Sequence, residues 1–283
     1  MRCIDLVTGA SSGLGRDIAK LLCEKGNIVY VVARRKEKLL ELKKECSKHK
    51  GQIKIIAGDL IDTKFRERLI KKVLKESGRI DHLINNAGYG TLIELEKQDI
   101  SDIQKMFEVN IISYEHLVSL ALPSMKRRKK GRIINTSSVA AFEPPPYFAT
   151  YNATKYAVYG FSRSLSHELA GTGVSVSVVF PARMKTNFWK VAFKCYGMTG
   201  TQKNTCYAKW TKGSSGSLPV AKVIVRNLDS KRLFILPNLL SLFAFYFLRH
   251  FYFIGTLYMK YLMRPKSKKV FSGHKVKKGY KKN

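Results

Sequence analysis

The sequence predicts an α/β fold in which a doubly wound parallel sheet is flanked by helices. Three observations predict it. Short apolar runs alternate with helical patterns over roughly the first 180 residues, and such alternation is typical of βαβ units. The apolar runs contain few polar residues, as expected of strands that helices cover on both faces. A cluster of glycines follows the first run, where a strand must turn into a helix.

Six strands are expected from the apolar runs. In chain order they are Cys3–Val7, Ile28–Ala33, Ile53–Ala57, His82–Asn85, Ile133–Thr136 and Val174–Phe180. A chain of 283 residues is long enough to bury such a sheet in one domain.

Helices are expected between these strands, where apolar residues recur at helical spacing. In the first of them Ile18, Leu21 and Leu22 share one face, and Gly26 marks its end. The expected helices are Leu14–Glu24, Lys36–His49, Lys64–Ser77, Asp102–Met125 and Asn152–Ala170, and a further one starts near Pro219.

Positive charge is concentrated in the second part of the chain. The formal net charge is +32, and Gly171–Asn283 holds 22 Lys and Arg against Asp229 alone. Such a segment should meet something anionic, which leaves a phosphate cofactor, an anionic membrane surface or nucleic acid as candidates. No recognised nucleic-acid-binding motif accompanies the charge, which argues against the last of these.

Cysteine and histidine usage argues against disulfides and metal sites. The five cysteines are scattered and form no CxxC pair, as expected of a reduced, intracellular protein. The six histidines show no paired-ligand spacing, so no metal is expected. The first strand begins at once, which leaves no room for a cleavable signal peptide. The expected location is the cytoplasm, with peripheral attachment to the cytoplasmic face of a membrane as a further expectation.

The glycine cluster between the first strand and the first helix predicts a pyrophosphate site. Glycines permit a tight turn and close approach of the backbone, and a helix N-terminus offers free N–H groups to an anion. This strand–turn–helix context is typical of a Rossmann-type dinucleotide site, although a tight turn without a ligand would show the same pattern. The cluster reads Thr8-Gly9-Ala10-Ser11-Ser12-Gly13-Leu14-Gly15.

The end of the second strand predicts which dinucleotide binds. NAD sites usually place an Asp or Glu there to bind ribose hydroxyls, whereas this chain has Arg34 and Arg35. Guanidinium groups suit a 2′-phosphate, so NADP(H) is the expected cofactor. Alternatively, one of the two arginines merely begins a solvated helix face.

Tyr151 and Lys155 are four residues apart at the start of a predicted helix, which places them on one face. A nearby ammonium favours the phenolate and should lower the pKa of the tyrosine. The pair alone is a weak signal, since many exposed helices contain it.

Together these motifs resemble the short-chain dehydrogenase/reductase family, in order, from about Cys3 to Thr186. Ser138 stands thirteen residues before Tyr151, as the catalytic serine of the family does. One departure is Ala182, where the family commonly has glycine after Pro181. The further matching motifs are Asp59-Leu60, Asn85-Asn86-Ala87-Gly88, Asn110, Pro181 and Thr186.

The resemblance implies a role for each matching residue. Tyr151 would be the general acid/base and Ser138 would polarise the substrate oxygen, with Ser137 as a second candidate. Lys155 would lower the tyrosine pKa and bind the nicotinamide ribose, and Asn110 would hold a water in a proton relay. The implied cofactor-binding set is Gly9, Ser11, Ser12, Gly13, Leu14, Gly15, Arg34, Arg35, Asp59, Leu60, Asn86, Ala87, Gly88, Tyr151, Lys155, Pro181 and Thr186.

The expected function is NADP(H)-dependent reduction of a carbonyl, or oxidation of a secondary alcohol, in a hydrophobic or lipid-like substrate. The alternative is a non-catalytic NADP(H)-binding protein of the membrane surface or of nucleic acid. Residues 187–218 interrupt the alternation and would cover the substrate, although their aromatic residues could equally pack on the core. The segment contains Phe188, Trp189, Phe193, Tyr196, Met198, Tyr207 and Trp210.

The C-terminal part is expected to form two further units beyond a catalytic domain of residues 1–232. Residues 233–263 read as an apolar helical segment, and residues 264–283 as a disordered tail with eight lysines. The apolar segment could lie in a membrane surface, pack in the core or in the interface of a homo-oligomer, or cross a membrane. The sequence leaves these three alternatives open.

Overall fold

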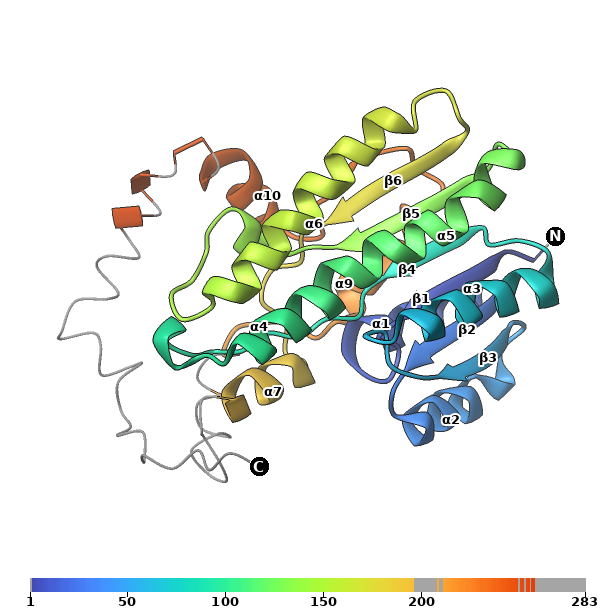
Figure 1. The fold of residues 1–283 in the computed structure, drawn as a ribbon, viewed down its shortest axis with the longest axis horizontal. Helices are drawn as coiled ribbons and strands as arrows, with labels where there is room; N and C mark the ends of the chain where they lie inside the picture. The colour runs from blue at the N-terminus through green and yellow to red at the C-terminus, as the bar shows by residue number, and fades with distance from the viewer. Residues whose placement is uncertain are drawn as a thin grey trace.

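A seven-stranded parallel sheet forms the centre of the protein in the computed structural model (Figure 1). The strand order is β3-β2-β1-β4-β5-β6-β7, which confirms the predicted doubly wound fold class. The strands are β1 (Ile4–Thr8), β2 (Ile28–Ala33), β3 (Gln52–Ala57), β4 (His82–Asn85), β5 (Gly131–Thr136), β6 (Val174–Val179) and β7 (Phe234–Ile235). The structure describes residues 2–195, 208, 211–248, 250, 251, 253, 254, 256 and 257.

The described helices follow the predicted order. They are α1 (Gly13–Glu24), α2 (Lys36–Glu45), α3 (Thr63–Ser77), α4 (Ile100–Phe107), α5 (Ser113–Arg127), α6 (Ala149–Glu168), α7 (Asn187–Cys195), α9 (Leu218–Arg226) and α10 (Leu239–Phe243). Short 3-10 turns η1 (Cys46–Lys48), η2 (Leu95–Lys97) and η4 (Val139–Ala141) and π-helical turns η3 (Glu108–Ile112) and η5 (Ala244–Leu248) complete the set.

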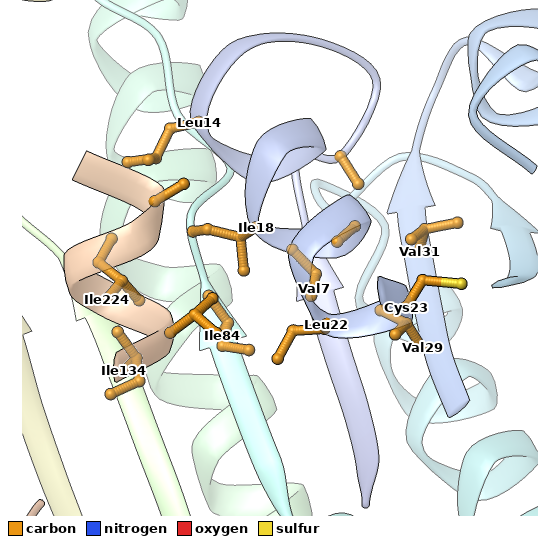
Figure 2. Packing of buried hydrophobic residues seen from close by; sticks show 14 of the residues in the cluster. Val7, Leu14, Ile18, Leu22, Cys23, Val29, Val31, Ile84, Ile134 and Ile224 are labelled. Atoms are coloured by element: carbon orange, nitrogen blue, oxygen red, sulfur yellow. The ribbon is translucent and has the colours of Figure 1, made fainter. Parts of the chain in front are cut away.

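Both faces of the sheet are buried under helices, which explains why the strands are apolar throughout. Residues of α1, α2 and α9 form one hydrophobic layer with the strands. Residues of α3, α5 and α6 form the other. Figure 2 shows the first layer, where Ile18 and Leu22 of α1 and Ile224 of α9 meet side chains of the central strands. All three are fully buried, and each such side chain contributes about 1.5–3 kcal/mol through burial.

The long helical stretch expected over Asp102–Met125 is interrupted. It divides into α4, the π-helical turn η3 and α5. A π-turn inserts an extra residue into a helix and frequently marks a functional site. Asn110 lies within this turn.

The beginning of the segment 233–263 belongs to the sheet. Phe234–Ile235 pairs in parallel with Val178–Val179 of β6, and Phe245 packs with Phe142 and Phe180. A strand of two residues is too short to show a period, so this apolar run looked helical in the sequence. The sheet therefore extends beyond residue 232.

A ligand should bind at the carboxyl ends of β1 and β4. These two strands are neighbours, but the chain continues from β1 towards one edge of the sheet and from β4 towards the other, and open α/β sheets bind ligands at such a point. Figure 1 shows α7 and α10 at this same end, to which the strand arrows point. Among the described residues, no helix combines the length and the apolar character needed to cross a membrane. The tail 264–283 and residues 258–263 lie outside the described residues.

Candidate active site

The glycine loop packs directly on the segment that follows β4. Gly9 has φ +70°, and a Cβ atom there would lie 2.8 Å from the Cα of Ala87. A Cβ on Gly15 would lie 2.5 Å from Nδ2 of Asn86. Side chains are therefore excluded at both glycines by the backbone and amide beside them. The structure thus brings two predicted cofactor motifs into contact.

Thr8 joins the same two motifs. Its Oγ1 accepts hydrogen bonds from the backbone N–H groups of Asn86, at 2.9 Å, and Ala87, at 3.0 Å. Asn86 Nδ2 donates in return to the Thr8 carbonyl, at 3.1 Å. The sequence does not single out Thr8 as a site residue, because a threonine at a strand end gives no signal of its own.

The N-terminus of α1 is shaped to receive an anion. The helix begins at Gly13, and the Ser12 side chain makes no capping hydrogen bond to it. Instead, Arg35 Nη2 donates to Ser11 Oγ at 2.9 Å and to Ser12 Oγ at 3.2 Å. Leu14 turns its side chain into the core, so only its backbone faces the loop. One guanidinium, two hydroxyls and free helix N–H groups thus converge.

Arg34 points to a different partner. Its Nη1 lies 3.8 Å from Oδ2 of Asp59, and its side chain is 75% exposed. Leu60 is buried in the same hydrophobic cluster as Val32 of β2. The two arginines that the sequence could not separate therefore differ: Arg35 lies against the glycine loop, and Arg34 lies over the end of β3.

The loop after β6 approaches the glycine loop at Gly13. The side chain of Thr186 lies 3.4 Å from the position of a Cβ on Gly13, and the carbonyl of Pro181 accepts from the backbone N–H of Val139 at 3.2 Å. Among the described non-glycine residues only Lys129 and Tyr147 have positive φ. The backbone at Ala182 therefore has a conformation that any residue can adopt. The glycine that is common at this position in the family is not required here.

Tyr151 and Lys155 lie on α6 with Ser138 close by. The hydroxyl of Ser138 lies close enough to the Tyr151 phenol to lower the pKa of that phenol. Lys155 Nζ donates to the carbonyl of Thr136 at 2.8 Å and lies 5.6 Å from the Tyr151 ring centroid. Because Lys155 is 4% exposed, its ammonium is held in place by buried partners.

Burial sets the proton affinities of these two groups. It raises the pKa of Tyr151 to about 12, against the lowering effect of the Ser138 hydrogen bond. It lowers the pKa of Lys155 to about 7. The sequence predicted that the ammonium would lower the tyrosine pKa, and this prediction is wrong for the structure described. The helix spacing reveals proximity but not desolvation, which disfavours both charged forms.

Ser137 and Ser138 play different structural parts. The hydroxyl of Ser137 is buried and donates to the backbone carbonyl of Lys155 at 2.7 Å. Ser138 Oγ accepts from the Ala140 N–H at 3.1 Å and remains beside Tyr151. Ser137 is thus engaged with the helix backbone, and Ser138 is the serine at the tyrosine.

Asn110 is held in the π-turn by three hydrogen bonds. Its Oδ1 accepts from the N–H of Tyr89 at 3.0 Å, and its Nδ2 donates to the Tyr89 carbonyl at 2.8 Å and to Thr154 Oγ1 at 3.0 Å. A Cβ on Gly88 would lie 3.1 Å from Asn110 Oδ1 and 3.6 Å from Lys155 Nζ. The motif after β4 therefore contacts both Asn110 and Lys155 at Gly88, where a side chain would crowd the Asn110 amide.

An aromatic wall stands over Tyr151. Its ring centroid lies 5.3 Å from that of Phe188 and 5.7 Å from that of Phe148. Trp189 packs on both phenylalanines and donates from Nε1 to the Met184 carbonyl at 3.1 Å. Of the residues predicted to cover the substrate, Tyr196, Met198, Tyr207 and Trp210 and the Phe193 side chain lie outside the described residues.

Sequence reasoning missed the residues that hold these groups from below. Tyr114 lies under Lys155, with Nζ 5.8 Å from its ring centroid, and donates to the Ala87 carbonyl at 2.8 Å. Thr154 holds Asn110. Both belong to helices whose apolar pattern gives them no distinguishing signal.

Comparison with known proteins identifies the family. Residues 4–196 match the sequence profile described as short chain dehydrogenase. The chain belongs to the short-chain dehydrogenase family. It is therefore an oxidoreductase that acts on CH–OH and C=O groups, which favours the enzyme over the non-catalytic alternative. No group of described residues could hold a metal ion.

Individual relatives agree with this family. An uncharacterized oxidoreductase of Staphylococcus epidermidis is 33% identical over 183 residues, which are 65% of this chain and 78% of that protein. A 3-ketodihydrosphingosine reductase of Bacteroides thetaiotaomicron is 32% identical over 185 residues, 65% of each chain. The crystal structure of a metagenomic short-chain oxidoreductase in complex with NADP is similar, with a TM-score of 0.69 and 27% identity over 82% of this chain and 95% of that one.

Proposed function

We propose that this short-chain dehydrogenase is an NADPH-dependent carbonyl reductase in which Tyr151, Ser138, Lys155 and Asn110 form the reacting site. The observation that carries the proposal is the cluster itself. The Ser138 hydroxyl lies close enough to the Tyr151 phenol to lower its pKa, and Lys155 Nζ lies 5.6 Å from the Tyr151 ring centroid. A Cβ on Gly88 would lie 3.1 Å from Asn110 Oδ1 and 3.6 Å from Lys155 Nζ, so both groups border the same glycine.

The chemistry of these residues favours reduction. With a pKa of about 12, the Tyr151 phenol stays protonated at neutral pH and can give its proton to the oxygen of a substrate carbonyl. Ser138 donates a hydrogen bond to the same oxygen and stabilises its developing negative charge. After this transfer Tyr151 must be protonated again. Lys155 would provide that proton, and Asn110 would hold the water through which Lys155 regains one. The nicotinamide, when bound, supplies the hydride.

The residues around the glycine loop fit NADP(H). The cradle at Gly9 and Gly15 admits no side chain, and the first turn of α1 lacks a side-chain cap. Arg35 with Ser11 and Ser12 offers a charged, hydrogen-bonding site for the 2′-phosphate. Asp59 and Leu60, directly after β3, are the residues that we propose would hold the adenine. The NADP complex of the related metagenomic oxidoreductase supports the same choice.

A pair of neighbouring serines tests the assignment of the reacting site. Ser138→Ala removes the hydroxyl beside Tyr151, and we expect kcat to fall by about 100-fold or more, as when an oxyanion donor is lost. Ser137→Ala removes a bond to the helix backbone, and its loss of kcat should be much smaller. Equal losses in the two variants would contradict the assignment.

The substrate we propose is a hydrophobic carbonyl compound. Phe148, Phe188 and Trp189 form an apolar wall around Tyr151, and apolar walls with few polar groups select hydrophobic ligands. The similarity to a relative named a 3-ketodihydrosphingosine reductase favours a ketone that carries a long chain. We expect kcat/KM for a series of ketones to rise with chain length. A preference for short polar ketones would contradict this substrate class.

We also propose that the C-terminal apolar face rests on an anionic membrane surface. This face comprises Leu239, Leu240, Phe243 and Tyr246, whose exposed fractions are 83%, 53%, 50% and 62%. It lies at the same end of the sheet as α7 (Figure 1), so a lipid substrate would enter from the membrane side. The excess of Lys and Arg after Gly171 provides the electrostatic attraction to anionic lipid.

Co-sedimentation of the full chain with vesicles tests this surface. We expect binding to vesicles that contain phosphatidylglycerol, and a large loss in Leu239→Glu. The control is Leu40→Glu on α2, where an apolar side chain is also 51% exposed but belongs to a different surface. Equal binding by both variants would contradict membrane docking. If the wild-type chain forms a homo-oligomer without lipid and Leu239→Glu is monomeric, the face binds a second copy of the chain instead.

A further inference from the structure

Arg66 is a buried arginine that connects two parts of the proposed site. It lies on α3 and is 2% exposed. Its Nη1 donates to the carbonyl of Leu60 at 2.9 Å and to Oε1 of Glu108 at 2.5 Å. Its Nε donates to Nδ1 of His116 at 3.0 Å, and its Nη2 to Thr63 Oγ1 at 2.8 Å. The planar guanidinium therefore holds four partners in a fixed geometry.

The first of these partners belongs to the proposed adenine subsite. Leu60 follows Asp59 directly after β3, and its side chain is buried in the core. The backbone N–H of Ile61 donates to Asp59 Oδ1 at 3.1 Å. The Leu60 carbonyl held by Arg66 thus fixes the turn that presents Asp59.

The second partner starts the π-turn that carries Asn110. Glu108 is the first residue of η3, and its side chain is 25% exposed against 3% for Arg66. Asn110 follows two residues later. Pairing with a buried guanidinium fixes the start of a turn whose geometry departs from the α-helices on either side.

We propose that Arg66 is a positioning residue that couples occupancy of the adenine subsite to the placement of Asn110. The inference rests on the proposed function, because it takes Asp59 and Leu60 as the adenine subsite. A ligand that orders the Leu60 turn also orders Arg66, since one Nη1 atom serves both Leu60 and Glu108. Arg66 in turn orders the π-turn. The adenine half of the cofactor would thereby prepare the proton-relay end of the site.

Hydrogen exchange of the full chain with adenosine 2′,5′-bisphosphate tests this coupling without turnover. We expect the ligand to slow exchange of the Glu108–Ile112 amides by about fivefold, the lower range of coupling between sites. In Arg66→Met the slowing should disappear while the ligand still binds. A matched control is Arg68→Met on the same helix, whose side chain is 65% exposed and whose loss should leave the slowing intact.

Two results would overturn the proposal: full slowing in Arg66→Met, or no slowing in the wild-type chain with ligand bound. If Arg66→Met does not fold, Glu108→Gln serves as the second variant, since it keeps the shape of the side chain but removes its charge. In Glu108→Gln the ligand should slow exchange of the Glu108–Ile112 amides less than in the wild type. Slowing equal to that of the wild type would contradict the coupling. Failure of the proposed reaction would instead appear as unchanged turnover in variants of Tyr151, which this measurement does not involve.

A kinetic measurement separates positioning from a merely structural role. Reduced nicotinamide mononucleotide lacks the adenine half, and free adenosine 2′,5′-bisphosphate can supply that half separately. We expect the bisphosphate to raise kcat with the mononucleotide in the wild type and in Arg68→Met, but not in Arg66→Met. A general loss of stability would lower kcat with and without the bisphosphate alike, and that pattern would overturn the coupling.

Discussion

The Nζ atom of Lys155 lies 5.6 Å from the ring centroid of Tyr151, and burial shifts the pKa of each residue away from its charged form. Lys155 titrates near pH 7 and Tyr151 near pH 12. At neutral pH the tyrosine is therefore protonated, and the lysine is divided between its two forms. This relationship connects the geometry of α6 to the direction of the proposed reaction and to the stability of the fold.

Replacement of Lys155 should stabilise the fold most at neutral and acidic pH. Its folded pKa of about 7 lies below the ordinary 10.5, so between these values the unfolded chain holds a proton that the folded chain lacks. The free energy of unfolding of the wild type therefore rises with pH across that window. Below about pH 7 the folded chain bears the full cost of burying the charged Lys155. We expect the free energy of unfolding of Lys155→Met to exceed that of the wild type by about 2 kcal/mol at pH 7. The gain is not larger because the variant also loses the hydrogen bond to Thr136.

Denaturant unfolding of both chains at several pH values checks this prediction. The gain of Lys155→Met over the wild type should shrink steadily as the pH rises from 7 to 10.5, the interval between the two pKa values. A gain that stays constant with pH would show that Lys155 is not desolvated as described.

Alcohol oxidation should depend strongly on pH, because it requires the phenolate of Tyr151. Because the pKa of Tyr151 is about 12, its phenolate fraction increases about tenfold with each unit by which the pH rises, as long as the pH is below the pKa. We expect the initial rate of oxidation to increase steeply in the alkaline range, while carbonyl reduction is already active at neutral pH. A flat oxidation profile would contradict the high tyrosine pKa.

Arg35 should determine the preference for NADPH over NADH. Its guanidinium lies on the Ser11 and Ser12 hydroxyls, and charged hydrogen bonds contribute about 1.5–3 kcal/mol. We therefore expect Arg35→Ser to weaken NADPH binding by about 10- to 100-fold with little change for NADH. Arg34→Ser, which removes a side chain that is 75% exposed and lies beside Asp59, should have a smaller effect. Equal losses for the two cofactors in Arg35→Ser would refute this role.

Gly90 should tolerate no side chain, because Tyr151 and Phe188 both approach it. An added Cβ would lie 2.9 Å from Phe188 Cζ and 3.0 Å from Tyr151 Cδ2. We expect Gly90→Ala to lower kcat/KM by about tenfold or more, since small displacements of reacting groups are costly. Gly160→Ala on α6 is the control, because nothing lies within 4 Å of its Cβ. Full activity of Gly90→Ala would show that the aromatic wall does not constrain Tyr151.

Much of the fold could be predicted from the sequence because burial on both faces makes each strand a continuous apolar run. The prediction of Cys3–Val7 as a strand differs from β1 by one residue at each end. β7 was missed because Phe234–Ile235 is too short for any periodicity. The π-turn was missed because the apolar pattern continues across it, and the bonds from Asn110 to Tyr89 and Thr154 join residues that are distant in sequence.

The site was only partly predictable for a similar reason. Spacing and ordered motifs identified the residues but not their surroundings. The pKa direction of Tyr151 was mispredicted because desolvation depends on how deeply α6 is buried. The separate partners of Arg34 and Arg35 depend on where β3 and the glycine loop lie, and neither position can be read from two adjacent arginines.

Turnover and NADPH binding measured together in Tyr151→Phe test the central proposal most directly. The substitution removes one hydroxyl and leaves the ring between Phe148 and Phe188, so the fold and the cofactor site should persist. The account predicts that the variant binds NADPH with wild-type affinity, followed by fluorescence, and loses carbonyl reduction almost completely. Carbonyl reduction at the wild-type rate in this variant would contradict the assignment of Tyr151 as the proton donor.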